Sequence, residues 1–431
     1  MPMRKKTRPM GKVMLLAAIL ALLTAILAAC GGGTSSKDKT ATAGAGGGKT
    51  PAAGATTAAT KAATAPAASS GGTITVKKGD KLKIGISTTL TTDNAQLGIP
   101  IRDAALLALK TKATIEGFTL EGDPQDDGCA GPASVTAANK LISDGVVAVL
   151  GPMCSGGTVA AQDPYAAASM LVVSGSATAV NVTLTAKKGF FRVAWNDSTQ
   201  GGEMAKYVYT TLGKKNAVLV NDQSVYGKGL MDVFKASFTT LGGKVVSEEA
   251  VTVGEKDFGP TVTKIKGETA DIVVFGGFIA EGAILVRQLS EAGVTATFMG
   301  ADGIADQKYI DQAGGKAEGS YVSRGPKPTD TTKYDAFAAA YKAEYNKEAG
   351  QFGDYATDGT NVILAAIESV ATVDSSGNLV IDRDKLIAAV KATDYSGATG
   401  EIKFNDKGDR IVVGAVNEID QVKGGKLTRI Q

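Results

Sequence analysis

Short apolar runs alternate with amphipathic segments along the chain from residue 82 to about residue 323. The apolar runs have the length of buried strands, and apolar positions three and four residues apart in the segments between them are typical of helices. Strands spaced by helices predict parallel sheets with helices on both faces. The predicted strands are residues 82–87, 118–122, 146–150, 171–174, 217–221, 244–251, 271–275 and 297–300, and the predicted helices include residues 100–110, 134–142, 200–212, 229–241 and 281–292.

The alternation restarts near residues 192–197, which indicates a boundary between two lobes. Asp197 or Ser198 is expected to cap the helix that follows. Trp195, the only tryptophan, is expected at the crossover between the lobes, where it either packs beneath a hinge or faces a ligand.

The rhythm changes after residue 324, where predicted helices at 334–346, 355–370 and 384–392 precede predicted strands at 401–404 and 411–420. A chain that returns to its first lobe and then to its second crosses between the lobes three times. A length of 431 residues also favours two domains over one. We therefore predict a two-lobed α/β fold, with residues 80–195 and 321–408 in an N-terminal lobe and residues 196–320 and 409–431 in a C-terminal lobe.

The N-terminal region is typical of an exported lipoprotein. Basic residues precede an apolar run over residues 13–29, and the small residues before Cys30 match a lipoprotein cleavage site. We expect residues 1–29 to be a signal peptide and Cys30 to carry the lipid. The Gly-, Ala- and Thr-rich residues 30–72 would then form a flexible tether with a mean reach of about 35 Å. The alternative is an uncleaved transmembrane anchor, for which the apolar run is at the short limit.

The net charge of +3 comes from this leader. Without its five basic residues, the 46 Lys and Arg become 41 against 43 Asp and Glu, which gives a net charge of −2. The sequence has no basic segment with interleaved aromatic residues, so nucleic acid is not expected as a partner.

The sequence contains no histidine, the residue most often used as a general base and as a metal ligand near neutral pH. It also lacks the GxxxxGK[ST] phosphate loop, the GxSxG nucleophile elbow, and a GxGxxG fingerprint after the first predicted strand. Cys129 and Cys154 are the only cysteines of the predicted body and suit a structural disulfide in an oxidising compartment, in which neither would be a nucleophile. We therefore expect no enzyme activity, no metal site and no cofactor.

A glycine-rich turn follows the predicted strand at residues 146–150. Ser155, Gly156 and Gly157 stand between that strand and a predicted helix at residues 158–168. Backbone N–H groups and a hydroxyl at a helix N-terminus are a favourable environment for an anion. The alternative is an ordinary strand-to-helix turn that binds nothing.

Six short motifs occur together between residues 126 and 303: DDGC at 126–129, GPMCS at 151–155, GSAT at 175–178, YG at 226–227, GGF at 276–278 and MGADG at 299–303. With these motifs, roughly residues 80–420 resemble the solute-binding proteins of branched-chain amino acid ABC transporters, of the leucine/isoleucine/valine-binding type. The resemblance implies a type I periplasmic binding protein fold. In that fold, two lobes, each a mainly parallel sheet flanked by helices, are joined by three crossovers and enclose the ligand in the cleft between them.

The resemblance also implies which residues hold the backbone groups of an amino acid. Position by position, the carboxylate-binding serine of the family falls on Ser155, and Ser176 and Thr178 complete the contacts. Hydroxyl and N–H groups at a helix N-terminus suit a carboxylate.

The acidic residue that the family uses for the α-ammonium group falls on Asp302, and aromatic residues of the cleft fall on Tyr226 and Phe278. One departure concerns the first loop, where some family members place a tyrosine before glycine and this chain has Leu97. The side-chain preference of that wall of the cleft therefore does not follow from the resemblance.

The resemblance implies a monomeric, lipid-anchored binding protein outside the cytoplasm that captures an amino acid, branched-chain or otherwise aliphatic, and delivers it to an ABC permease. The same fold could instead serve amides, urea or aromatic acids, or act as a ligand-sensing receptor module. A cell-surface enzyme on this fold is a further alternative, which the absence of histidine disfavours.

Overall fold

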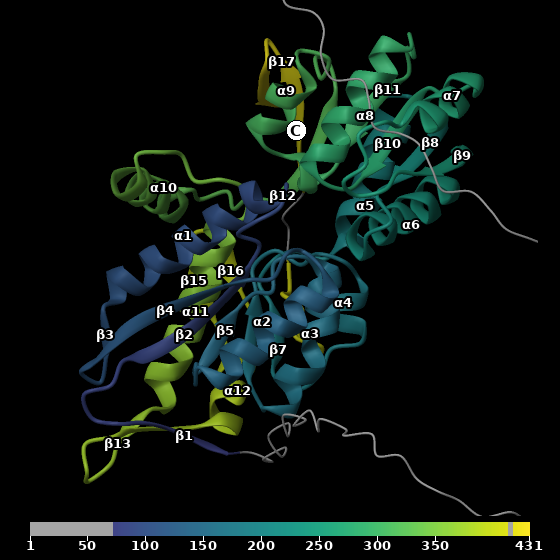
Figure 1. The fold of residues 1–431 in the computed structure, drawn as a ribbon. Helices are drawn as coiled ribbons and strands as arrows, with labels where there is room; N and C mark the ends of the chain where they lie inside the picture. The colour runs from purple at the N-terminus through teal and green to yellow at the C-terminus, as the bar shows by residue number, and fades with distance from the viewer. Residues whose placement is uncertain (1–71, 413–416) are drawn as a thin grey trace, which may run out of the picture. The chain divides into compact units, whose positions relative to one another are not determined.

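The computed structural model describes residues 72–412 and 417–431. The predicted signal peptide, Cys30 and the predicted tether up to residue 71 lie outside the described residues. The described part contains two large sheets, each surrounded by helices (Figure 1).

The first sheet has six strands in the order β3-β4-β2-β5-β6-β7. All neighbours are parallel except the short β3, which is antiparallel to β4. Its strands are β2 (Leu82–Thr88), β3 (Thr114–Ile115), β4 (Phe118–Asp126), β5 (Ala148–Leu150), β6 (Leu171–Ser174) and β7 (Phe190–Arg192).

Helices cover both faces of this sheet, because each parallel connection must return across it. The helix α1 (Ala95–Lys112) packs against α11 (Gly353–Val370), which also contacts β5 and β6, whereas α2 (Gly131–Ser143) packs against α3 (Ser155–Ala167) (Figure 1). The remaining elements of this lobe are α4 (Asn181–Leu184), α10 (Thr332–Tyr345), α12 (Arg383–Lys391), the three-stranded sheet of β1 (Thr73–Val76), β14 (Leu379–Asp382) and β13 (Thr372–Val373), and the hairpin of β15 (Tyr395–Gly397) and β16 (Gly400–Ile402).

The second sheet has seven strands in the order β18-β17-β12-β11-β10-β8-β9. They are β8 (Asn216–Asn221), β9 (Lys244–Ala250), β10 (Ile272–Gly276), β11 (Thr297–Gly300), β12 (Tyr321–Pro326), β17 (Asn417–Lys423) and β18 (Lys426–Arg429), with β17 and β18 antiparallel to their neighbours. Its helices are α5 (Asp197–Lys206), which continues into a π-helical turn η1 (Tyr207–Thr211), α6 (Val225–Thr240), α7 (Gly259–Gly267), α8 (Ile279–Glu291), the 3-10 turn η2 (Asp302–Ile304) and α9 (Gln307–Ala313).

The chain passes from the first sheet to the second after β7, returns after β12, and enters the second sheet again at β17. These three crossings confirm the predicted two-lobed α/β fold. Hereafter, the first lobe is the six-stranded sheet with its helices and small sheets, and the second lobe is the seven-stranded sheet with its helices.

The structure corrects the predicted boundaries between the lobes. Residues 321–326 were assigned to the N-terminal lobe, but as β12 they pair in parallel with β11 and antiparallel with β17 in the second sheet. The reason is that β11, α9 and β12 form one more strand-helix-strand unit. The alternation of strands and helices in the second sheet therefore ends one strand later than predicted. At the other end, Asp409, assigned to the C-terminal lobe, forms a β-bridge with Arg192 of β7 in the first lobe.

The start of α5 also differs from the prediction that Asp197 or Ser198 is its cap. The cap is Asn196, whose side-chain oxygen accepts a hydrogen bond from the backbone N–H of Ser198. Asp197 is the first residue inside the helix and is fully buried. Its side chain is therefore placed by tertiary packing rather than by capping.

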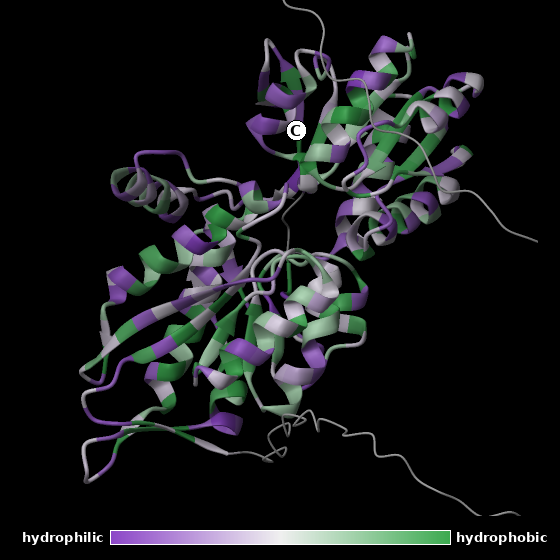
Figure 2. Ribbon diagram, viewed as in Figure 1, coloured by the Kyte–Doolittle hydropathy of each residue, from purple (hydrophilic) through white to green (hydrophobic). Residues whose placement is uncertain are grey.

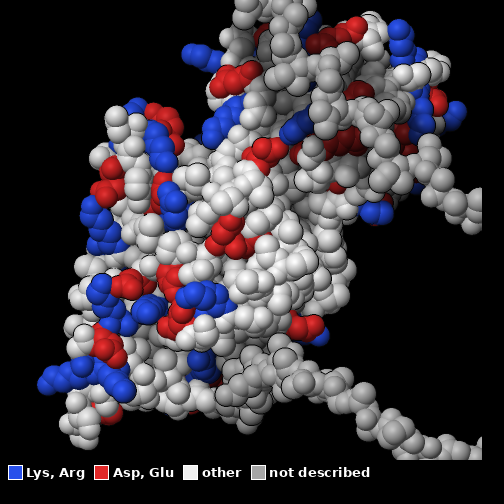
Figure 3. Space-filling model, in the orientation of Figure 1, with Lys and Arg blue, Asp and Glu red and all other residues white. Residues whose placement is uncertain are grey.

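Hydrophobic residues fill the sheets, and hydrophilic residues lie on the outer sides of the helices (Figure 2). On the face shown in Figure 3, basic and acidic side chains are interspersed rather than gathered by sign. Two exposed ion pairs, Lys110–Glu344 and Lys112–Glu368, both 2.7 Å long, tie α1 to α10 and α11. Exposed pairs of this kind contribute at most about 1 kcal/mol each.

Candidate ligand-binding site

One pocket is lined by the ends of strands and helices from both lobes. Open α/β sheets place ligands at the carboxyl ends of their strands. Its lining includes every residue predicted to bind the ligand, together with Leu97, which was expected in the first loop and lies in the first turn of α1. The lining residues are Leu97, Met153, Cys154, Ser155, Ser176, Thr178, Tyr226, Phe278, Asp302, Gly303 and Phe352. The sequence-predicted residues therefore lie together, although they are spread over about two hundred positions of the chain.

Ser155 is the first residue of α3, directly after the strand β5 and its turn. Its hydroxyl oxygen accepts a hydrogen bond of 3.2 Å from the backbone N–H of Ala179. That bond orients the hydroxyl and leaves its proton for another acceptor. The first N–H groups of α3 also lack partners within the helix, so this end of the pocket offers several donors to a carboxylate.

Ser176 and Thr178 follow β6 in an irregular segment. The Ser176 hydroxyl donates to the carbonyl oxygen of Met153 at 2.9 Å, so this proton is already bonded within the protein. The Thr178 hydroxyl is buried and forms no hydrogen bond of standard geometry with the described residues, although it lies near enough to the Asp197 carboxyl to oppose the rise in the pKa of that group. Thr178 is therefore the more available hydroxyl of the two.

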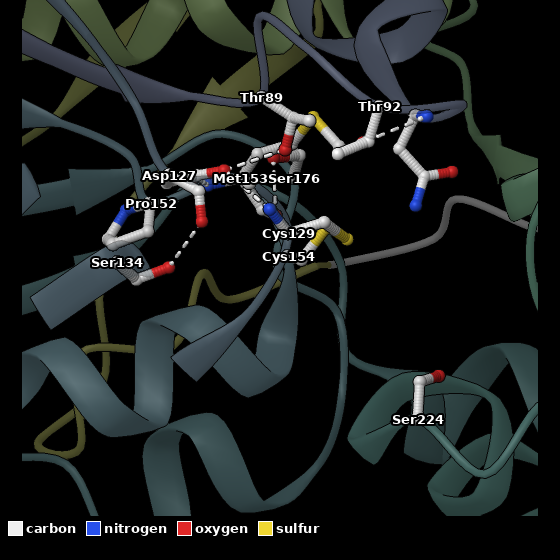
Figure 4. Close-up of a disulfide and its surroundings, with 12 residues drawn as sticks. Thr89, Thr92, Asp127, Cys129, Ser134, Pro152, Met153, Cys154, Ser176 and Ser224 are labelled. Carbon is white, nitrogen blue, oxygen red and sulfur yellow. Dashed lines mark hydrogen bonds between the residues drawn. A yellow bond between two sulfur atoms is a disulfide. The ribbon is translucent and has the colours of Figure 1, made fainter. Parts of the chain in front are cut away.

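A disulfide joins Cys129 to Cys154, the residue before α3 (Figure 4), with Cα atoms 5.1 Å apart, as predicted from the sequence. The buried carboxylate of Asp127 accepts hydrogen bonds from the Thr89 hydroxyl at 2.6 Å and from the backbone N–H groups of Cys129 and Met153 at 3.1 and 2.9 Å. Burial raises the pKa of Asp127, and these hydrogen bonds oppose that rise. Asp127 thus ties the turn before α3 to Thr89 and to the backbone at Cys129.

The second lobe contributes a hydrogen-bonded pair, Tyr226 and Asp302. The Tyr226 hydroxyl donates to Oδ1 of Asp302 at 2.8 Å and accepts from the backbone N–H of Gly303 at 3.0 Å. The Phe278 ring packs against Tyr226, with ring centroids 5.4 Å apart. All three side chains are buried, so the pair is held rigidly at the pocket wall.

Close backbone packing explains the glycines beside these residues. A Cβ atom on Gly227 would lie 2.4 Å from the carbonyl oxygen of Gly276, and one on Gly303 would lie 2.3 Å from the carbonyl oxygen of Gly277. Any side chain at these positions would push α6, the end of β10 and the turn η2 apart. The motifs at 226–227, 276–278 and 299–303 therefore bring Tyr226 to Asp302.

Two buried carboxyl groups of the second lobe interact electrostatically, Asp302 in the pocket lining and Asp197 outside it. Burial raises the pKa of Asp302 to about 6, although the Tyr226 hydroxyl and the Gln200 amide oppose the rise. Burial and the charge of Asp302 raise the pKa of Asp197 well above its usual value. The sequence analysis treated Asp197 only as a candidate helix cap.

Trp195 lies behind the pocket rather than in it. Its ring stacks on Phe352 with centroids 5.3 Å apart, and its indole N–H donates to Gln200 at 2.9 Å. Phe352, which lines the pocket, was missed in the sequence analysis. Its φ of +67° is rare for a large side chain, and the only sequence signal is its place between glycines at 350 and 353.

Within the part of the chain that the structure describes, no group of three or more His, Cys, Asp or Glu side chains is arranged to hold a metal ion. The helices of the same residues include none that is long and apolar enough to cross a membrane.

Comparisons with known proteins agree with this architecture. Residues 81–418 match the family model described as "Periplasmic binding protein". The chain is 32% identical over 333 residues to a leucine-, isoleucine-, valine-, threonine- and alanine-binding protein of Pseudomonas aeruginosa, which covers 77% of this chain and 87% of that protein.

Two solved structures share the fold at 26% sequence identity, each covering 81% of this chain. One is the leucine-binding protein LivK of Thermotoga maritima, with a TM-score of 0.74 over 98% of its chain. The other is the branched-chain amino acid transporter substrate-binding protein LivJ of Streptococcus pneumoniae in complex with isoleucine, with a TM-score of 0.72 over 99% of its chain. The chain therefore belongs to the periplasmic binding protein family.

Proposed function

We propose that the protein binds an α-amino acid in the pocket described above. The observation that carries this proposal is that one pocket contains two kinds of polar group. Hydroxyl and N–H donors lie at the start of α3 in the first lobe, and a buried carboxyl, Asp302, lies in the second lobe. The donors suit the ligand carboxylate, and the carboxyl suits the ligand ammonium group. Ser155 and Thr178 would hold the carboxylate, with Ser176 supporting the turn through its bond to Met153.

The ligand side chain would be aliphatic. The pocket lining includes the apolar side chains of Leu97, Phe278 and Phe352 and the ring of Tyr226. Such a wall gains free energy mainly by burying apolar ligand surface, about 25 cal/mol per Å². The names of the Pseudomonas, Thermotoga and Streptococcus relatives support the branched-chain class.

The protein would act outside the cytoplasm as a monomer, held to the membrane by a lipid on Cys30, and would deliver its ligand to an ABC permease. The sequence before Cys30 and membership of the periplasmic binding protein family support this location. Closure of the two lobes about the crossovers would enclose the ligand, as in other hinged binding proteins. Labelling cells with a fatty-acid probe, with Cys30→Ala as the control, tests the anchor.

Calorimetric titration against the twenty amino acids, after removal of any co-purified ligand, tests the binding function. Urea, small amides and benzoate belong in the same screen, because the fold alone admits them. A ligand at about 100 times its Kd should stabilise the protein by about 2.7 kcal/mol, which a thermal-shift assay detects. Stabilisation by an amide or an aromatic acid, and by no amino acid, would overturn the proposal.

A further inference from the structure

Arg192, the last residue of β7, has a charged side chain that is completely buried. All five N–H groups of its guanidinium group are hydrogen-bonded. Nε and Nη2 donate to Oδ1 of Asp409, and Nη2 also donates to the Thr183 hydroxyl at 3.1 Å. Nη1 donates to two backbone carbonyl oxygens, that of Ala177 at 3.0 Å and that of Ala179 at 2.9 Å. A buried guanidinium group is tolerated when it is paired and hydrogen-bonded in this way.

The two carbonyl oxygens belong to the segment 177–179, which lines the ligand pocket through Thr178. This segment lies outside any helix or strand, so its backbone groups need other partners. Arg192 holds both ends of the segment through one nitrogen atom. At one of these ends, the backbone N–H of Ala179 donates to the Ser155 hydroxyl at 3.2 Å. The position of Ala179 therefore sets the direction of the hydroxyl that is proposed to donate to the ligand carboxylate.

The guanidinium group is anchored on its other side to the chain that precedes the third crossing. Asp409 forms a β-bridge with Arg192 and also bonds its side chain. The second carboxylate oxygen of Asp409 accepts hydrogen bonds from the Thr183 hydroxyl at 2.8 Å and from the side-chain amide of Asn196 at 3.3 Å. Because the guanidinium group is planar and rigid, these bonds also fix the position of Nη1.

We propose that Arg192 is a positioning residue for the ligand carboxylate. Anchored by Asp409, it fixes the segment 177–179, and through Ala179 it directs the Ser155 hydroxyl into the pocket. The inference rests on the proposed amino acid function and adds to it two residues that do not line the pocket themselves.

Lysine cannot replace Arg192 in this role. Its one ammonium nitrogen can bond either to Asp409 or to the two carbonyl oxygens, but it cannot occupy the positions of Nε, Nη1 and Nη2 together. Arg192→Lys therefore keeps the buried charge and loosens the segment 177–179. The Ser155 hydroxyl would then lose the donor that orients it, and the contact with the ligand carboxylate would weaken.

The test is a double-mutant cycle of Arg192→Lys with Ser155→Ala, measured by calorimetric titration of the full mature chain. The probes are L-leucine, L-isoleucine, L-valine, L-threonine and L-alanine, and Kd is compared for the one that binds the parent most tightly. Arg192→Lys should increase Kd about tenfold in the parent, since a hydrogen bond to a charged group contributes about this factor. In the Ser155→Ala background it should increase Kd by at most about threefold, because the hydroxyl that it positions is already absent.

Arg410→Lys is the matched control. Arg410 lies beside Asp409 and also donates to backbone carbonyl oxygens, including those of Val193 at 3.2 Å and Thr399 at 2.7 Å. None of the residues that its side chain bonds lines the pocket. Its effect on Kd should be the same in both backgrounds to within about twofold.

Equal losses from Arg192→Lys in both backgrounds would overturn the inference, because the residue would then support the fold and not the carboxylate contact. A Kd within about twofold of the parent would do the same, as would an equally large background dependence for Arg410→Lys. Each of these results leaves the amino acid function intact. Binding of none of the five amino acids would refute that function, and the inference with it.

Asp409→Asn decides by the same comparison if Arg192→Lys does not fold. It keeps one side-chain oxygen for Arg192 and removes the oxygen that accepts from Thr183 and Asn196. This variant should increase Kd about threefold in the parent and leave it unchanged in the Ser155→Ala background. An equal increase in both backgrounds, or none in either, would overturn the inference.

Discussion

Replacing Asp302 by asparagine removes the charge of the carboxylate and keeps its shape. The amide oxygen can still accept the hydrogen bond that Tyr226 donates at 2.8 Å, so the pocket wall should stay in place. A bound ammonium group would lose a countercharge in a buried site, which costs about 2–5 kcal/mol. At about 1.4 kcal/mol per factor of ten, affinity should fall by roughly 30-fold to several thousand-fold.

The same change should make the free protein more stable. Burial raises the pKa of Asp302 from 3.8 to about 6. A carboxyl whose pKa is raised on folding destabilises the protein as pH rises from the unfolded value through the folded one, and the penalty is complete above about pH 6. The shift corresponds to about 3 kcal/mol at neutral pH, which Asp302→Asn should recover in large part.

Titration calorimetry and urea unfolding at about pH 7.5 measure the two effects on one preparation. Asp306→Asn is the matched control, because it makes the same substitution in the same segment at the cap of α9, where asparagine also serves as a cap. The control should change neither affinity nor stability by more than about 0.5 kcal/mol. Binding by Asp302→Asn within about threefold of the parent would refute the ammonium assignment, since that is well under 1 kcal/mol.

Ser155→Ala should weaken binding by about 1–3 kcal/mol in the same titration, less than Asp302→Asn, because the N–H groups of α3 remain; a larger loss than that of Asp302→Asn would contradict the assignment. Replacing both Cys129 and Cys154 by serine should lower the free energy of unfolding by about 3 kcal/mol, because the disulfide closes a loop of 25 positions in the unfolded chain. Equal urea midpoints and slopes for the variant and the parent would contradict this stabilisation. Phe352 lines both the pocket and a neighbouring cavity of about 290 Å³, so Phe352→Ala should join the two. The binding free energy of phenylalanine should then become more favourable, relative to that of leucine, by about 1 kcal/mol or more. An unchanged preference would mean that Phe352 does not limit ligand size.

Most of the parallel strands were predictable because parallel strands buried on both faces are nearly continuous apolar runs, but β7 and β12 were not among the predicted strands. Residues 171–174 and 297–300 match β6 and β11 at both ends. The lobe membership of residues 321–326 was not predictable in this way, since an apolar run does not say which sheet it joins. The small sheet formed by β1 and β14 was missed because its strands are four residues long and some three hundred positions apart.

The residues of the candidate site were likewise predictable where the local sequence places them and not where tertiary packing does. Ser155 and Asp302 were predictable because each stands at the end of a strand, in a motif that also contains glycine. Asp197 and Phe352 were not, because their roles depend on packing. An aspartate at a helix start usually caps it, and only the fold shows that Asn196 takes the cap and that Asp197 points into the protein.

The candidate site therefore contains destabilising features that a bound ligand would relieve. The Asp302 carboxyl is buried with a raised pKa, the Thr178 hydroxyl forms no hydrogen bond of standard geometry with the described residues, and Phe352 keeps an unfavourable backbone conformation. Each such feature lowers the stability of the free protein by an amount of the order of 1–3 kcal/mol. The disulfide at Cys154 and the hydrogen bonds of Asp127 stabilise the same turn and offset part of that loss. Because an ammonium and a carboxylate group would satisfy these groups only together, the site favours a zwitterion over a ligand with one charge or none.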